Sequence, residues 1–175
     1  FLIKNYGAGL AQLGVLKPFV LSTMALMKTI PCEEVESYEG FFTAKANESK
    51  KPIIGLESPE FQIGIFDKIP MEVQIEELIK MLKEESGEAE FNQMTETYRT
   101  EDIEKLYQIM TEEGMVAEYM DLILDSRNKA WVSKLEEEMK SQILFVAVGG
   151  GHLGGENGLI SLLRNSGYRV EPINQ

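Results

Sequence analysis

The sequence predicts an α/β fold in which a sheet core carries a large helical insertion. An apolar run at 143–148 leads into a glycine-rich loop that contains His152, the one histidine in the sequence. Such a run, rich in β-branched residues, is typical of a strand that is buried on both faces of a parallel sheet. A second apolar run, at 52–57, has a similar form. Residues 70–142 show only helical periodicity and are the expected insertion.

The amino-terminal elements are predicted to be helices. Residues 1–30 have apolar positions at helical spacing, with one break near the middle of the range. Ser37 is placed to cap a further helix that runs through Asn47. The run at 52–57 then forms a strand, and Glu57 lies at its carboxyl end.

The helical block at 70–142 is expected to contain three or four helices. Gly87 and Gly114 are the expected breaks between them, because glycine interrupts helices readily. No linker rich in proline or serine separates a second domain. Residues 1–175 are therefore expected to form a single domain that includes this block.

A βαβ unit is predicted at the carboxyl end of the chain. The strand at 143–148 is followed by the glycine loop and by a helix over 157–165. Gly167 is a good terminator for that helix, and residues 168–172 are expected to form a short strand. Strand, loop, helix and strand make one unit with a right-handed crossover.

The composition excludes several classes of partner. Lysine and arginine total 17 and aspartate and glutamate total 29, so the formal net charge is −12. This charge argues against binding to the phosphates of nucleic acids and to anionic lipid. No apolar run approaches the roughly 18 residues that a membrane span needs.

Glu57 and His152 are the first candidate site residues. In open α/β sheets, ligands bind beyond the carboxyl ends of the strands, and each of these residues follows a predicted strand directly. We therefore expect both to face one cleft. The alternatives are a histidine with a purely structural role and a carboxylate that belongs to a helix cap, since Ser58 and Pro59 follow Glu57.

Arg127 and Asn128 are further candidates, at the entrance of an amphipathic helix. A solvated cap is the simplest explanation for the neighbouring Asp125 and Ser126. Arg127 could instead point into the cleft, where its planar fork of donors would bind a carboxylate or an oxyanion.

The glycines around His152 allow two other interpretations. Gly149, Gly151 and Gly154, with Glu171 after the next predicted strand, match the spacing of a dinucleotide-binding fingerprint. The same glycines could instead serve only to let a strand and a helix pack closely.

Three segments resemble the TraB/GumN family, which includes PrgY-like and Tiki-like proteins. They are 37–46 with 51–58, 125–131, and 146–159 with 167–170. The family's second Gly-x-x-His motif falls on Gly149 to His152. The resemblance implies a fold of the type found in Tiki, TraB, erythromycin-esterase and ChaN proteins.

The resemblance also implies a metal-dependent hydrolase, most often a peptidase, that acts on a peptide or protein substrate. His152 would be one metal ligand, and Glu57 and Arg127 would be catalytic. The remaining positions that match the family would form the substrate loop: Gly149, Gly150, Gly151 and Asn128. Manganese or cobalt is the expected divalent metal, with zinc as an alternative.

The family's first Gly-x-x-His motif has no counterpart in this sequence, which contains no second histidine. We therefore expect the family's amino-terminal part to be missing from this sequence and to be a partner of this chain. These 175 residues alone are then expected to be inactive. An extracytoplasmic location is implied by the resemblance. Capture of a peptide without cleavage, as in PrgY-like proteins, and the dinucleotide site are the alternative functions.

Overall fold

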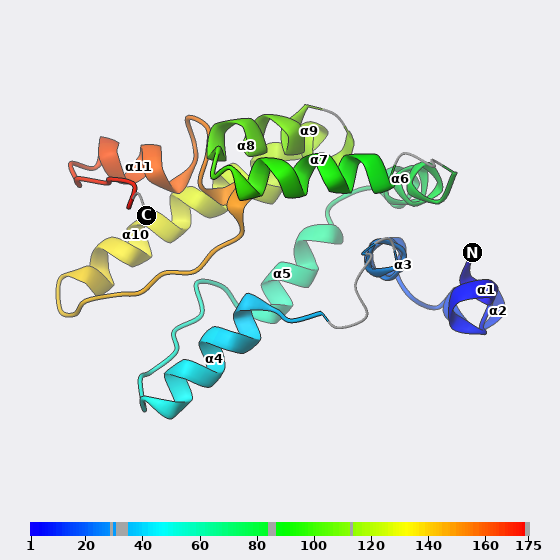
Figure 1. The fold of residues 1–175 in the computed structure, drawn as a ribbon, viewed down its shortest axis with the longest axis horizontal. Coiled ribbons are helices and arrows are strands. Elements are labelled where there is room, and N and C mark those ends of the chain that lie inside the picture. The colour runs from blue at the N-terminus through cyan, green and yellow to red at the C-terminus, as the bar shows by residue number, and fades with distance from the viewer. Residues whose placement is uncertain (29, 31–34, 84–86, 113, 174–175) are drawn as a thin grey trace.

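The computed structural model describes residues 1–28, 30, 35–83, 87–112 and 114–173. Throughout these residues the regular structure is helical, and no strand or sheet is formed among them. The prediction of an α/β sheet core is therefore wrong. The molecule is elongated, with the amino terminus toward one end of the long axis and α11 toward the other (Figure 1).

The first half of the chain forms six of the labelled helices (Figure 1). They are α1 (Leu2–Tyr6), α2 (Leu10–Leu13), α3 (Pro18–Met27), α4 (Tyr38–Glu48), α5 (Pro59–Phe66) and α6 (Met71–Lys83). The second half forms α7 (Gly87–Arg99), α8 (Ile103–Thr111), α9 (Gly114–Glu118), the π-helical turn η1 (Asp121–Asp125), α10 (Ser126–Met139), the 3₁₀ turn η2 (Gly150–His152) and α11 (Leu159–Asn165).

The predicted helix ends are confirmed where they depend on short-range hydrogen bonds. The hydroxyl of Ser37 accepts from the backbone N–H of Gly40 at 2.9 Å and begins α4. At the start of α5, Ser58 caps the helix in the same way, as the capping alternative for this segment expected. Gly167 ends α11 with a φ of 92°, a conformation that glycine adopts at little cost.

The helical periodicity over 70–142 is also confirmed. α7 begins at Gly87 and α9 begins at Gly114, the two predicted breaks. A further break, at 100–102, was not expected, and there the carboxylate of Asp102 accepts from the N–H of Lys105 and caps α8.

The segment 143–148 is extended, and within the described residues it pairs with no other segment. Its described residues make no backbone–backbone hydrogen bond, and the side chains of Ile143 and Phe145 are 101% and 76% exposed. The prediction of a strand buried on both faces is wrong because strand formation depends on a neighbouring strand, not on the apolar run itself.

The predictions of the other two strands are also wrong for the described residues. Residues 51–55 have no regular structure, and Ile53 and Ile54 are exposed. Residues 168–173 run on from α11 without a ladder, although Arg164 donates to the carbonyl oxygen of Val170. The predicted βαβ unit is therefore not formed by the described residues.

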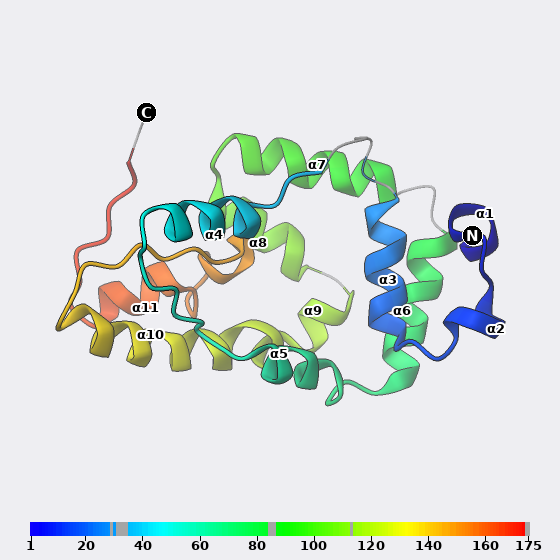
Figure 2. The same ribbon diagram turned by 90° about the horizontal axis from the view of Figure 1, so that it is seen from below.

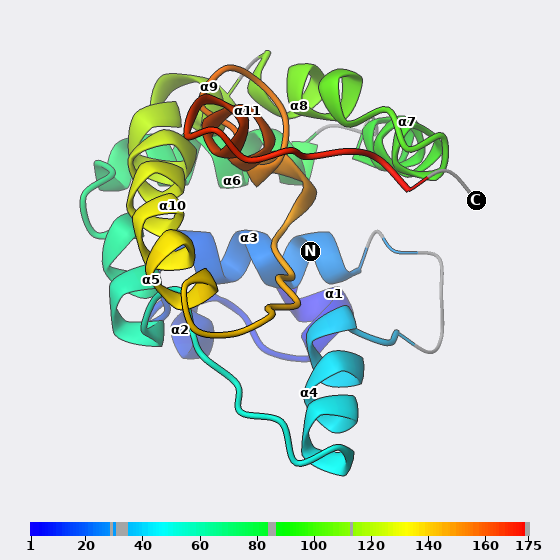
Figure 3. The ribbon, with the colours of Figure 1, turned by 90° about the vertical axis from the view of Figure 1, so that its left-hand side faces the viewer.

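The core nearest to His152 lies between α10 and α11, which run beside one another in Figures 2 and 3. Trp131, Val132 and Leu159 form its buried cluster. Leu56 and Val148 pack against this cluster from the ends of the two extended segments. The ends of these two segments thus reach α10, although neither segment forms a strand within the described residues.

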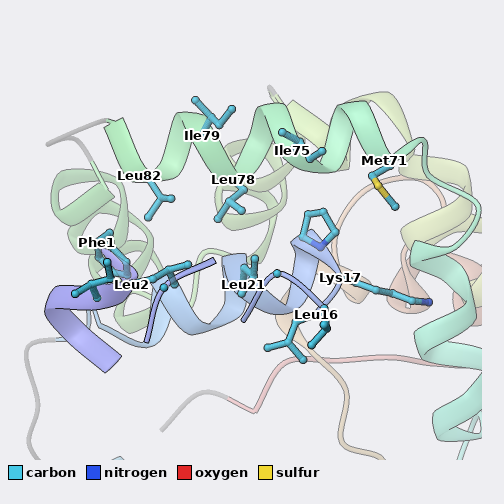
Figure 4. A pocket seen from close by; sticks show the side chains of 15 residues that line it. Phe1, Leu2, Leu16, Lys17, Leu21, Met71, Ile75, Leu78, Ile79 and Leu82 are labelled. Carbon is cyan, nitrogen blue, oxygen red and sulfur yellow. The ribbon is translucent and has the colours of Figure 1, made fainter. Parts of the chain in front are cut away.

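A separate hollow of about 790 Å³ opens between the amino-terminal helices and α6 (Figure 4). Leu78 and Leu82 of α6 point toward the amino-terminal helices across it. Its lining is almost wholly apolar, and its one charged member, Lys17, forms an ion pair with Asp67. The hollow contains none of the predicted site residues and no group suited to hydrolytic chemistry.

Candidate functional site

A buried ion pair joins two of the predicted site residues. The guanidinium of Arg127 donates to both carboxylate oxygens of Glu57, from Nε at 3.0 and 3.1 Å and from Nη2 at 2.8 Å. The two side chains are only 13% and 7% exposed. This two-pronged geometry is the strongest arrangement for an arginine and a carboxylate, and it holds the extended segment at 51–57 against α10.

The indole of Trp131 connects this ion pair to His152. Arg127 Cζ lies 4.9 Å from the centre of the Trp131 ring, and the ring of His152 lies 4.4 Å from it, centre to centre. Trp131 is 5% exposed and belongs to the core between α10 and α11. Three of the site side chains are thus packed on one another, and the core fixes their position.

A chain of hydrogen bonds holds His152 from its other side. His152 Nδ1 lies 2.7 Å from Asn128 Oδ1, and Asn128 Nδ2 donates to the carbonyl oxygen of Asn157 at 2.8 Å. Asn157 Nδ2 in turn donates to Asp125 Oδ2 at 2.8 Å. Asn128 is 1% exposed, so the amide at the centre of this network is enclosed by protein.

The π-helical turn η1 sets the orientation of these residues at the start of α10. Arg127 Nη1 donates to the carbonyl oxygen of Ile123 at 2.8 Å, inside that turn. Turns of this kind are rare and frequently lie at functional sites. Because Asn128 and Trp131 are three residues apart, they project from the same face of α10.

Three glycines of the loop lie where an added Cβ atom would come close to α8 or to the loop's own backbone. A Cβ atom on Gly154 would lie 2.9 Å from the carbonyl oxygen of Ile103, and one on Gly151 would lie 2.8 Å from Met110 Cε. A Cβ atom on Gly158 would lie 2.1 Å from the carbonyl oxygen of Gly154. This packing supports the interpretation in which the glycines bring backbone and helix together, as opposed to an open cradle for phosphates.

The environment of Glu57 keeps it ionised. Burial by itself raises the pKa of this carboxyl, but the hydrogen bonds and the charge of Arg127 outweigh it and hold the pKa below the ordinary value. Trp131 and Gln62 contribute in the same direction, although the indole Nε1 has no partner in hydrogen-bonding geometry within the described residues.

The environment of His152 keeps it neutral. Burial, assisted by the nearby charge of Arg127 and opposed by Glu57, lowers the pKa of His152 to about 4. At neutral pH its imidazole therefore carries one ring hydrogen and one free lone pair, which is the form that binds a metal ion or accepts a proton.

The described residues do not by themselves fit a metal centre. Among them, no group of three or more histidine, cysteine, aspartate or glutamate side chains is placed to hold an ion. His152 is the only histidine in the sequence, and Glu57 is committed to Arg127. A catalytic metal usually has three protein ligands.

The structure gathers most of the predicted site residues but changes their expected setting. Glu57, Arg127, Asn128 and His152 lie around Trp131, and no sheet edge brings them together within the described residues. Asp125 and Ser126 do not form the expected solvated cap, because Asp125 binds Asn157 and Ser126 binds Asp121.

Sequence reasoning missed the roles of Trp131 and Asn157. One signal was available, since Asn128 lies on the same helical stripe as Trp131, Val132 and Leu135. A polar residue on an otherwise apolar stripe indicates a buried hydrogen-bond network.

Comparison with known proteins places this site in a family context. The sequence profile of the TraB/PrgY/gumN family matches residues 2–172, which is nearly the whole chain. The chain has no match among the curated proteins or the solved structures with which it was compared. No helix in the described ranges is long and apolar enough to cross a membrane. The match covers every residue of the cluster, and the chain belongs to the TraB/PrgY/gumN family.

Proposed function

We propose that this chain carries part of a hydrolytic site for peptide bonds, with His152 as its reactive residue. One observation carries the proposal: a neutral histidine is packed on Trp131 next to a buried Arg127–Glu57 ion pair. Perturbed ionisable groups that lie together in this way are characteristic of functional sites. The family resemblance, which implies metal-dependent hydrolases, supports the same conclusion.

In this proposal each side chain has a separate task. The lone pair of the neutral His152 would supply one ligand to a divalent ion. Arg127 uses three N–H groups on Glu57 and Ile123. The other two of the five N–H groups in a guanidinium are left to contact a peptide carboxylate or an oxyanion. Glu57 then serves to hold Arg127 in place.

The proposal includes a metal ion whose ligands are shared between His152 and other polypeptide. His152 would supply one ligand, and the others would come from polypeptide outside the described residues, because these residues contain no complete set. Manganese or cobalt remains the first expectation and zinc the alternative. An extracytoplasmic location, which the resemblance implies, is part of the same proposal.

A second candidate function is capture of a peptide without cleavage. Two observations favour it. The carboxylate of Glu57 is held by three hydrogen bonds from Arg127, so it is not free to act as a general base. The segment 143–148, which leads into the His152 loop, exposes apolar side chains and unpaired backbone among the described residues. An extended peptide is recognised by these two features together.

The experiment that separates the two functions measures binding and cleavage in the same samples. The protein as the cell produces it is mixed with an unstructured peptide library, with manganese, with cobalt, or with a chelator. We expect cleavage detected by mass spectrometry, its loss with the chelator, and its loss in His152→Ala. Arg169→Ala, at a position exposed to solvent and outside the cluster, should cleave as the wild type does.

Each outcome has a defined meaning. Peptide binding measured by calorimetry without cleavage would favour the capture function. Cleavage that is unaffected by both the chelator and His152→Ala would contradict the hydrolytic proposal. Cleavage by the 175-residue chain alone that the chelator abolishes would contradict the shared ligand set.

A further inference from the structure

The hydrogen bonds around Asn128 permit only one assignment of donors and acceptors. The carbonyl oxygen of Asn157 can only accept, so the Asn128 atom 2.8 Å from it must be Nδ2. Oδ1 of Asn128 then faces His152, at 2.7 Å from Nδ1. Since Oδ1 also only accepts, the hydrogen of the neutral imidazole must be on Nδ1.

The burial of Asn128 excludes other arrangements of these hydrogen bonds. Asn128 is 1% exposed, so water cannot replace either partner. If the carboxamide were flipped, its oxygen would face the carbonyl oxygen of Asn157, and two buried acceptors would lie against each other without a hydrogen. The ring of His152 is also packed on Trp131, so turning it over would break the bond to Asn128.

Asp125 anchors the network at its far end. Its Oδ2 atom accepts from Asn157 Nδ2 at 2.8 Å. Asp125 is the last residue of η1, and Asn128 lies in the first turn of α10. Two hydrogen bonds therefore tie the loop that contains Asn157 to one short stretch of helix, which fixes the carbonyl that orients Asn128.

We infer that Asn128 is a positioning residue that, with Asn157 and Asp125, holds His152 in its Nδ1–H tautomer and leaves the lone pair on Nε2. Nε2 is then the ring nitrogen whose lone pair is available to a ligand. Second partners of this kind set the tautomer of many histidines that bind metals. The tautomer itself does not depend on the proposed function; only the role of Nε2 rests on it.

The tautomer can be observed directly because the chain has a single histidine. A long-range ¹H–¹⁵N spectrum of labelled protein at pH 7, without metal or peptide, reports its two ring nitrogens. We expect Nδ1 to give a protonated, pyrrole-type signal and Nε2 an unprotonated, pyridine-type signal. In Asn128→Ala we expect the Nε2–H form, which predominates for free histidine in water, to become the major species.

Matched variants separate the network from general damage. Asn157→Ala keeps its backbone carbonyl but loses the bond to Asp125, and we expect a mixture of tautomers. Asn165→Ala, at an exposed position at the end of α11, should give the wild-type spectrum.

Two results would overturn the inference. One is a wild-type spectrum with the hydrogen on Nε2, and the other is an Asn128→Ala spectrum identical to that of the wild type. If Asn128→Ala does not fold, the wild-type and Asn157→Ala spectra decide the question. An unchanged Asn157→Ala spectrum would remove the Asn157 side chain and Asp125 from the network. Absence of hydrolysis with the expected tautomer would refute the proposed function alone.

Discussion

The segment 143–148 and the loop 149–158 are adjacent in the chain but opposite in their packing. The first is the most apolar stretch of the sequence, yet Ile143 is 101% exposed. The second is mostly glycine and polar residues, yet it packs against α8 and bonds to α10. The comparison shows that burial follows from complementary partners and not from hydrophobicity alone.

The same contrast applies to ion pairs. Arg127 and Glu57 form a buried pair that links segments 70 residues apart. Arg169 and Glu171 form a pair that is exposed to solvent. Four predictions, from the largest expected effect to the smallest, set the packed region against the open one.

The first prediction compares two large apolar side chains. Trp131→Ala should lower the free energy of unfolding by about 3–5 kcal/mol, because it removes the ring on which Arg127 and His152 are packed. Ile143→Ser should change it by less than about 0.5 kcal/mol, since that side chain is fully exposed. Urea unfolding followed by circular dichroism measures both. Equal losses would show that the segment 143–148 is buried in solution.

The second prediction compares the two ion pairs. Arg127→Met should lower the free energy of unfolding by about 3 kcal/mol, because it leaves the Glu57 carboxylate buried without a partner. The double variant Glu57→Gln with Arg127→Met should recover part of that loss. Arg169→Met should change it by less than about 1 kcal/mol. Chemical unfolding of the four proteins tests this, and a small loss in Arg127→Met would argue that the Glu57 pair is solvated.

The third prediction compares two glycines. Gly158→Ala should cost about 1–3 kcal/mol, because its methyl group would meet the carbonyl oxygen of Gly154. Gly64→Ala, in the middle of α5 with open space around it, should gain about 0.5–1 kcal/mol of helix stability. Thermal unfolding should therefore shift in opposite directions. Shifts of the same sign would contradict the packing of the loop.

The fourth prediction concerns the protonation of His152. Burial and the charge of Arg127 lower the pKa of His152 from 6.5 to about 4, and the charge of Glu57 opposes them. Between these two pH values the unfolded chain therefore binds a proton that the folded chain does not. Stability should be fully present above pH 6.5 and should decline as the pH falls from there toward 4. An NMR titration of the single histidine measures the pKa.

A control for this titration is available in His152→Gln, which should lose stability less steeply between pH 6.5 and 4. A histidine pKa near the ordinary value in the folded protein would mean that the ring is solvated, like the segment that precedes it.

Much of the candidate site could be predicted from residue type and position in the sequence. The sequence predicts three site residues at the end or the beginning of a predicted element: Glu57, Arg127 and His152. The structure brings all three around Trp131. The role of Asn128 differed, since the resemblance placed it in a substrate loop and the structure places it in a buried network. Its partner Asn157 is 29 residues away, and no local pattern reveals such a distance.

The sequence by itself determined the elements that depend on neighbours a few residues apart. Ser37 and Ser58 each bond to an N–H three residues on, and Gly167 supplies a positive φ that ends α11. These interactions can be predicted from the local sequence, because they need no long-range closure.

Only the tertiary structure decided what the apolar runs and the polar site residues would do. A strand requires a second strand to complete its hydrogen bonds, and within the described residues neither 52–57 nor 143–148 has one. The pairing of Arg127 with Glu57, and of Asn128 with His152, depends on how α10 packs against distant segments. Such contacts are set by the whole fold, because each must offset the entropy of closing a long loop.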